Sequence, residues 1–229
     1  PCKTHLKVKN QMKTLLLAFV AFGGSSLFGA SIYVNTVNDT GSTYQYSANG
    51  YSAIGDQVTL AGTERFATEA TTQFFNVLPT SGFFDATLAL YGVGSDPDVL
   101  GTLLVTTTLT DISIPGFDIQ NPLTSGTVTV TFSGLNVNVP NELIFVLTVA
   151  NVRNADLGVT IFDGPTVGFS DSSKFISAVG NTFSVANADP GYGNLNFSLT
   201  AATVGEVPEP ATLPLLGAAP FAAAVVMSV

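Results

Sequence analysis

The sequence predicts an all-β protein, an antiparallel β-sandwich with jelly-roll-like connections, and three observations favour this fold class. Apolar residues alternate with polar ones at a period of two, as in strands with one buried face. Clusters of Gly, Pro, Asn and Asp separate these short runs. No long stretch shows the 3.6-residue period of an amphipathic helix. Many short strands between turns are typical of sandwiches and also of barrels, so an open barrel is the alternative.

Candidate strands follow one another along the chain at 57–61, 66–77, 84–93, 103–109, 127–132, 143–149, 157–162, 182–186 and 194–200. In the strand at 127–132, Val and Phe occupy one face and Thr the other. In the strand at 194–200, Leu and Phe alternate with Asn and Ser. Thr on an outer face suits a β surface that carries few charges.

Composition limits the chemistry that the chain can perform. Of its 229 residues, 46% are hydrophobic and only 10% are charged, against about 25% in an average domain. The net charge of −9 disfavours binding to nucleic acid, because phosphates would be repelled. The one Cys and the one His both precede Met12. We therefore expect neither a disulfide nor a cofactor or metal held by these side chains.

The beginning of the chain has the pattern of a secretory signal peptide. Lys13 follows Met12, an apolar run occupies 15–22, and small residues follow at 23–26 and 29–31. The run is too short to anchor a protein in a bilayer. We interpret 1–11 as an upstream, non-native start and 12–30 as a helical signal peptide. Cleavage is expected near Ala30 or Ser31.

The other end carries a second export-related pattern. Residues 207–212 read Val-Pro-Glu-Pro-Ala-Thr, and the 19 residues 211–229 contain no charge, which is about the length of a membrane-spanning helix. This combination resembles the PEP-CTERM sorting signal of Gram-negative bacteria. The resemblance implies that Pro208, Glu209 and Pro210 are recognised by an exosortase, a membrane transpeptidase, and that 211–229 form a transient membrane anchor. The family pattern also ends in an Arg-rich cluster, which this stretch does not contain.

The predicted domain organisation is therefore a β-sandwich at 31–206, followed by the sorting and anchor segment at 207–229. Segments of the body at 55–62, 86–91, 101–104 and 165–168 are similar to domains that recur in PEP-CTERM proteins. That similarity implies an exported β-sandwich and names no activity.

Two small groups of residues are candidates for a binding site. Tyr44, Tyr46 and Tyr51 lie in a stretch rich in Gly, Ser and Asn that reads as an exposed loop, where the rings could stack on sugars. The alternative is that they are edge or core tyrosines. Asp96 and Asp98 place two carboxylates in one loop, a weak candidate for calcium against a simple solvated turn.

These observations predict an exported, non-enzymatic protein of the outer cell surface or extracellular matrix of a Gram-negative bacterium. Its expected partners are the export machinery and exosortase, with extracellular polysaccharide as a further one. A carbohydrate-binding β-sandwich module of the exopolysaccharide matrix is the alternative. A hydrolase would need two acids facing each other in one cleft, and no Gly-x-Ser-x-Gly nucleophile motif is present.

Overall fold

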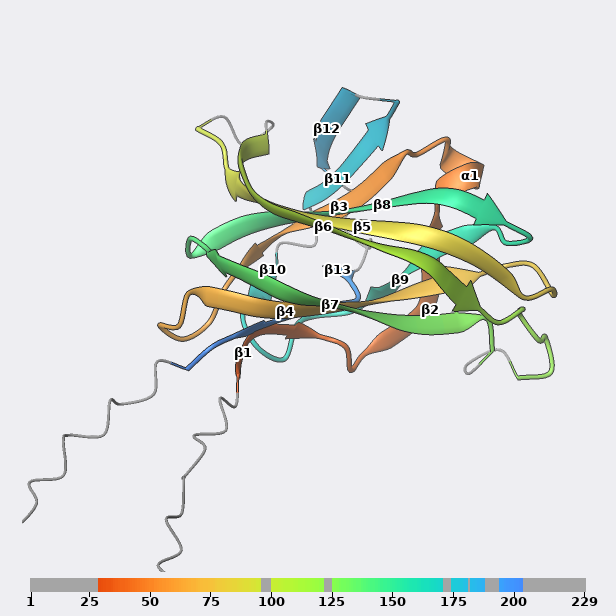
Figure 1. The fold of residues 1–229 in the computed structure, drawn as a ribbon, viewed down its shortest axis with the longest axis horizontal. Helices are drawn as coiled ribbons and strands as arrows, with labels where there is room; N and C mark the ends of the chain where they lie inside the picture. The colour runs from red at the N-terminus through yellow and green to blue at the C-terminus, as the bar shows by residue number, and fades with distance from the viewer. Residues whose placement is uncertain are drawn as a thin grey trace, which may run out of the picture.

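Two antiparallel sheets packed face to face form the described part of the protein (Figure 1). This computed structural model describes residues 29–95, 100–121, 125–170, 174–180, 182–187 and 194–203. The all-β prediction is confirmed, and the strands form two sheets instead of one open barrel. The helices predicted at the two termini, within 12–30 and 207–229, fall almost entirely outside the described residues.

Sheet A is built around one central strand. Among the described residues its seven strands are β1 (Ala30–Asn35), β2 (Asp39–Gln45), β4 (Phe66–Asn76), β7 (Thr127–Asn138), β9 (Leu157–Phe162), β13 (Asn194–Leu195) and β14 (Phe197–Ala201). The central strand β4 pairs with β7 along one edge. Its other edge is shared, because β14 pairs with residues 67–72 and β9 with residues 74–76. Sheet A therefore forks beside β4.

Sheet B faces sheet A. In the part of the chain that the structure describes, its seven strands are β3 (Ala53–Thr59), β5 (Gly82–Val93), β6 (Leu100–Ile114), β8 (Glu142–Arg153), β10 (Phe169–Ser170), β11 (Lys174–Val179) and β12 (Thr182–Asn187). They run in the order β12-β11-β3-β8-β5-β6, and β10 also pairs with β3. A single-turn helix, α1 (Tyr46–Asn49), connects β2 in sheet A to β3 in sheet B.

Strand pairing is nested. The hairpin β5–β6 is innermost, and outside it β4 pairs with β7, β3 with β8 and β2 with β9. Successive pairs alternate between the sheets, so that β2-β9-β4-β7 faces β3-β8-β5-β6. Every one of these contacts except the innermost hairpin joins segments far apart in sequence.

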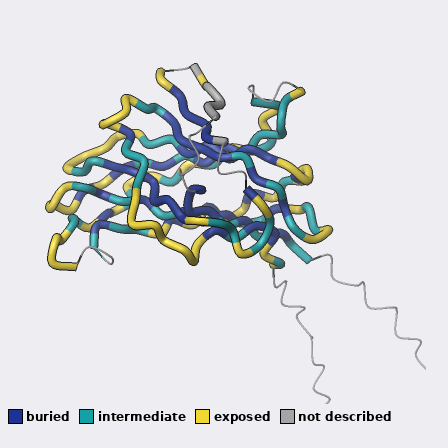
Figure 2. Tube along the Cα trace, turned by 180° about the vertical axis from the view of Figure 1, so that it is seen from behind, coloured by how far each residue is buried: buried dark blue, intermediate teal, exposed yellow. Residues whose placement is uncertain are grey.

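The core lies between the sheets, and its aromatic side chains meet across the gap. Phe145 of sheet B stacks on Phe197 of sheet A, with ring centroids 3.8 Å apart. Phe74 of sheet A meets Phe84 of sheet B at 5.0 Å. Buried segments run along the strands of both layers (Figure 2). Burying such rings supplies much of the favourable free energy of folding.

The predicted alternation in β7 is confirmed, because Phe132 is buried while Thr129 and Thr131 are exposed. The alternation at 194–200 does not divide core from solvent: Asn194 and Asn196 are each only 5% exposed. Both lie where the chain enters the fork of sheet A. There the Asn196 amide N–H donates to the Thr160 carbonyl oxygen at 2.9 Å.

Several elements were not predicted: β1, β2, β10, β11 and the helix α1. The strand predicted at 57–61 runs instead from Ala53 to Thr59. The first half of this strand was missed because it contains a charged residue, Asp56. The side chain of Asp56 is nevertheless only 2% exposed, and it accepts a hydrogen bond of 2.9 Å from the Ser170 hydroxyl. A buried carboxylate with such a partner interrupts the apolar pattern that marks a strand.

Candidate functional site

The structure corrects the expectation that the tyrosine-containing stretch is an exposed loop. Tyr44 lies on β2 and Tyr46 on α1. Tyr46 is 5% exposed, and its hydroxyl donates to the Leu147 carbonyl oxygen at 3.1 Å. Burial raises its pKa above the ordinary value. Tyr44 and Tyr51 are half-buried around Phe175, with ring centroids at 4.2 Å and 5.8 Å. The three rings therefore pack against the core, and Tyr46 in particular has no free face.

The other predicted site residues are two aspartates and the sorting motif. Asp96, Asp98 and the sorting motif Pro208, Glu209 and Pro210 lie outside the described residues. Within the described ranges, no group of three or more His, Cys, Asp or Glu side chains comes together as a metal site would require. No helix in those ranges is long and apolar enough to span a membrane.

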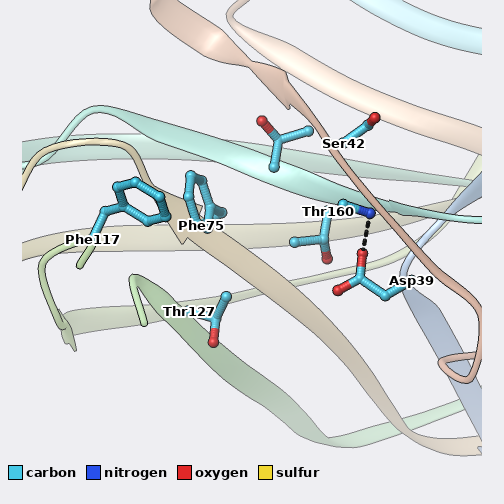
Figure 3. Close-up of a pocket in the computed structure, with 8 residues that line it drawn as sticks. Asp39, Ser42, Phe75, Phe117, Thr127 and Thr160 are labelled. Carbon is cyan, nitrogen blue, oxygen red and sulfur yellow. Dashed lines mark hydrogen bonds between the residues drawn. The ribbon is translucent and has the colours of Figure 1, made fainter. Parts of the chain in front are cut away.

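A pocket of about 200 Å³ opens on sheet A, beside the paired strands β2 and β9 (Figure 3). Its walls come from β2, β4, β7, β9 and the loop after β6, and its lining residues are Asp39, Gly41, Ser42, Thr43, Phe75, Phe117, Thr127 and Thr160. Figure 3 shows the two phenylalanine rings side by side at one end and Asp39 at the other. The pocket thus combines an aromatic wall with hydroxyl groups.

The aromatic wall is held in place by backbone contacts. The rings of Phe75 and Phe117 meet edge to face, with centroids 5.4 Å apart. The Phe117 amide N–H donates to the Leu78 carbonyl oxygen at 2.7 Å. Gly126, at φ +71°, lies close to both residues: an added Cβ would lie 2.8 Å from the Asn76 carbonyl oxygen, 3.2 Å from the Phe117 Cα and 3.2 Å from a ring carbon of Phe75. A side chain at Gly126 would therefore displace this wall.

Asn76 positions the loop that carries Phe117. Its side chain is fully buried, and its Nδ2 donates to the carbonyl oxygens of Thr80 at 2.8 Å and Pro115 at 3.2 Å. Its Oδ1 accepts from the amides of Leu78 at 3.1 Å and Asp156 at 3.0 Å. One amide therefore ties the end of β4 to three loops, and burial makes each of these bonds costly to lose.

A second hollow of about 410 Å³ lies further along sheet A. Its lining carries no ionisable side chain and consists of Ser31, Val34, Thr36, Thr71, Gln73, Thr129, Phe162, Asn196 and Ser198. Thr71 and Ser198 face each other across β4 and β14, with their hydroxyl oxygens 2.5 Å apart. Hydroxyl and amide groups both donate and accept hydrogen bonds, so this uncharged lining can bind either donors or acceptors of a ligand.

The two hollows meet at one pair of side chains. Thr160 lines the first and Gln73 the second, and the Thr160 hydroxyl lies 3.1 Å from the Gln73 Oε1. In the register of β4 and β7, Gln73 is opposite Thr129 and Phe75 is opposite Thr127. We call the two adjoining hollows together the outer groove; it is defined by Thr71, Gln73, Phe75, Thr127, Thr129, Thr160 and Ser198.

The charge around the outer groove is weakly negative. Asp39 is the one ionisable residue among those lining the two hollows, and its Oδ1 accepts the Gly41 amide at 2.8 Å. Beyond Thr71 on β4, Glu69 accepts a hydrogen bond of 3.0 Å from the Ser133 hydroxyl. With no cation in its lining, the groove suits an uncharged polar ligand better than an anionic one.

A further hollow of about 530 Å³ on sheet B contains three charged residues, and it is lined by Asp85, Thr110, Asp111, Asn151 and Arg153. Arg153 forms an exposed ion pair with Asp111. The Asn151 side chain and the Asp111 amide both hydrogen-bond to Asp85, which lowers the Asp85 pKa below its usual range. These groups satisfy one another, which leaves little to attract a ligand.

Comparisons of the chain with protein-family models, with curated proteins and with solved structures found no match. The site must therefore be judged on its own chemistry.

The outer groove was not predicted from the sequence, although part of its signal is visible there. Thr127 and Thr129 stand at outward positions of a predicted strand. A large aromatic residue at an outward position, such as Phe75, is the further sign that a sheet face is occupied. Thr160 and Ser198 carry no such sign, since only strand pairing brings them to β4.

Proposed function

We propose that this chain is an exported, non-enzymatic protein of the cell surface or extracellular matrix, sorted through its residues 207–229. The sandwich is proposed to be a jelly roll, a class that the nested pairing of eight strands supports. Its proposed partners are the export machinery and an exosortase, which would recognise Pro208, Glu209 and Pro210. Residues 211–229 would anchor the chain transiently.

One observation carries this proposal furthest: the two ends of the sandwich lie at the same point. Ala30 at the start of β1 pairs with Ala201 at the end of β14. A leader before residue 30 and a sorting segment after residue 206 would therefore join the sandwich at one pole. A domain tethered in this way can be released by cutting next to its last strand, without cutting the fold itself.

Mass spectrometry of the exported protein tests the proposal. In a Gram-negative host with an active exosortase, we expect a mature N-terminus near Ala30 or Ser31 and a C-terminus shortened to the region of the Pro208–Pro210 motif. Glu209→Ala should leave the C-terminus uncut. Glu142→Ala, which removes an exposed carboxylate on the sandwich, is the matched control and should be processed normally.

An exported parent chain that still ends at Val229 would disprove the sorting proposal. Equal processing of the Glu209→Ala variant and the parent chain would disprove the role of the motif.

A carbohydrate-binding module is the second candidate function, and a specific observation favours it. That observation is the outer groove of sheet A, which is rich in hydroxyl and amide groups and has no cation in its lining, and not the tyrosines at 44–51, whose rings pack against the core.

A further inference from the structure

We infer that the outer groove of sheet A is a binding site for a neutral polysaccharide chain. The inference concerns the sandwich alone and does not rest on how the protein is sorted. Three properties of the groove support it: the chemistry of the lining, the shape and the rigidity.

The chemistry of the lining matches a polymer of uncharged sugars. A sugar hydroxyl both donates and accepts hydrogen bonds. Side-chain hydroxyls and amides also do both, so they can pair with it as donor or as acceptor. In the part of the chain that the structure describes, the hydroxyls of Thr127 and Thr129 have no intramolecular hydrogen bond, and both lie in half-buried or exposed positions on the groove. These groups are available to a ligand.

The charge distribution argues against an anionic polymer. The lining of the two hollows contains no Lys or Arg, and its one ionisable residue is the acidic Asp39; a second carboxylate, Glu69, follows beyond Thr71 on β4. The whole chain has a net charge of −9. An acidic polysaccharide or a nucleic acid would find repulsion and no ion pair here.

The shape is elongated and ends at an apolar wall. Thr71, Gln73 and Phe75 follow one another on the outward face of β4, which spans about 13 Å at the usual rise per residue of a strand. That length suits a short stretch of a linear chain better than a single sugar. The rings of Phe75 and Phe117 close one end and offer an apolar surface to the C–H face of a sugar ring.

The groove is preorganised. Its polar groups stand on paired strands, and the pairs Thr71–Ser198 and Gln73–Thr160 hold two of its walls together. The loop bearing Phe117 is fixed by the buried Asn76 amide. Because few groups would have to be ordered on binding, little conformational entropy would be lost.

Affinity electrophoresis of the full chain tests the inference. The gels would contain dextran, galactomannan or hydroxyethyl cellulose as neutral polymers, alginate as the acidic polymer, or no polymer. We expect retardation by at least one neutral polymer and none by alginate. The variant Thr127→Val with Thr129→Val keeps the shape and strand preference of both side chains and removes two hydroxyls. Its dissociation constant should rise about tenfold, the usual effect of losing two hydrogen bonds.

Matched controls separate the groove from the rest of the surface. Thr102→Val with Thr106→Val makes the same change at two exposed positions of β6 in sheet B and should bind like the parent chain. Phe117→Ala removes one ring of the apolar wall and should weaken binding by a similar factor. Thermal unfolding of each variant shows that its fold is kept.

Three results would overturn the inference: no retardation by any of the neutral polymers, retardation by alginate in preference to them, or equal binding by the groove variant and the parent chain. None of these results bears on the masses of the exported protein, so this inference and the sorting proposal fail separately.

Discussion

Asp85 shows how a single side chain can join three strands. It stands on β5, between β6 and β8. The pairing register shifts next to Asp85 against both of these neighbouring strands. The flanking residues Asp111 and Asn151 adopt positive φ values of 54° and 49°. This places the Asp111 amide 2.9 Å and the Asn151 Nδ2 2.6 Å from the carboxylate of Asp85. Two bulges are thus closed by one carboxylate.

The resulting pKa shift predicts a pH-dependent contribution to stability. The Asn151 hydrogen bond, then the Asp111 amide, lower the Asp85 pKa below 3.8. In acid the unfolded chain therefore binds more protons than the folded one. The stabilisation is complete above the unfolded pKa and is lost as the pH falls through the folded pKa. Asp85→Asn should lower the free energy of unfolding at pH 7, and the deficit should shrink between about pH 5 and pH 2.

Urea unfolding of both proteins at several pH values measures this difference. Asp163→Asn, at an exposed turn, controls for the loss of one negative charge. A deficit of the Asp85 variant that stays constant down to pH 2 would contradict the argument.

At the scale of the element, β7 contains a bulge in which one residue has a left-handed backbone conformation and an open space where a side chain would be. Its register against β4 moves between the pairs Ala67–Val137 and Glu69–Ser133, so residues 134–136 lie opposite Thr68. Gly134 in this segment has φ +74°, and an added Cβ there would meet nothing within 4 Å. Any cost of a side chain at this position is therefore conformational.

We predict that Gly134→Ala lowers the free energy of unfolding by about 1 kcal/mol, because a left-handed backbone is costly for a residue with a Cβ. Gly92→Ala in β5 is the matched control: its φ lies outside the positive range, and its Cβ would meet only the Thr102 carbonyl oxygen at 3.9 Å. That variant should be as stable as the parent or slightly more so. Thermal or urea unfolding measures both. Equal losses in the two variants would show that the bulge is not responsible.

The same scale shows which strands can be recognised from sequence. Leu88 and Phe132 lie on strands with a regular alternation, and both are buried as their patterns predict. The strands β1 and β2 were not predicted. β2 reads Asp-Thr-Gly-Ser-Thr-Tyr-Gln and has no buried residue, so it is a strand only because β9 supplies its hydrogen bonds. A pattern based on burial cannot find a strand that buries nothing.

At the scale of the whole molecule, the sandwich is closed by β14, the last strand in the described part of the chain. β14 lies between β1, the first strand, and β4, the centre of sheet A. It contributes Phe197, Leu199 and Ala201 to the core, all with 0% exposure. The fold therefore cannot be completed until residue 201 is available to pair with residue 30.

Truncation tests this closure. A chain ending at residue 203 should unfold cooperatively, whereas a chain ending at residue 196 should not. Burial of Phe197 and Leu199 is worth about 1.5–3 kcal/mol for each side chain, and loss of the strand also leaves unpaired edges on β1 and β4. Such a loss approaches the total stability of about 5–15 kcal/mol of a typical domain. Circular dichroism during heating distinguishes the two chains. A cooperative transition of the shorter chain near the same temperature would contradict this role of β14.

Local pattern alone determined that this chain is all-β and that Thr127 and Thr129 face outward, because the direction of a side chain on a strand depends on residues two apart. It also carries the two terminal patterns on which the sorting proposal depends. The tertiary structure decided which outward residues meet. Thr160 and Gln73 are 87 residues apart in sequence, and the fork of sheet A brings them together. The tertiary structure also buries the side chain of Tyr46 in the core. The physical reason is that strand pairing is non-local. The sequence of one strand does not reveal which other strand it will hydrogen-bond to, so a groove made across four strands exists only once they are paired.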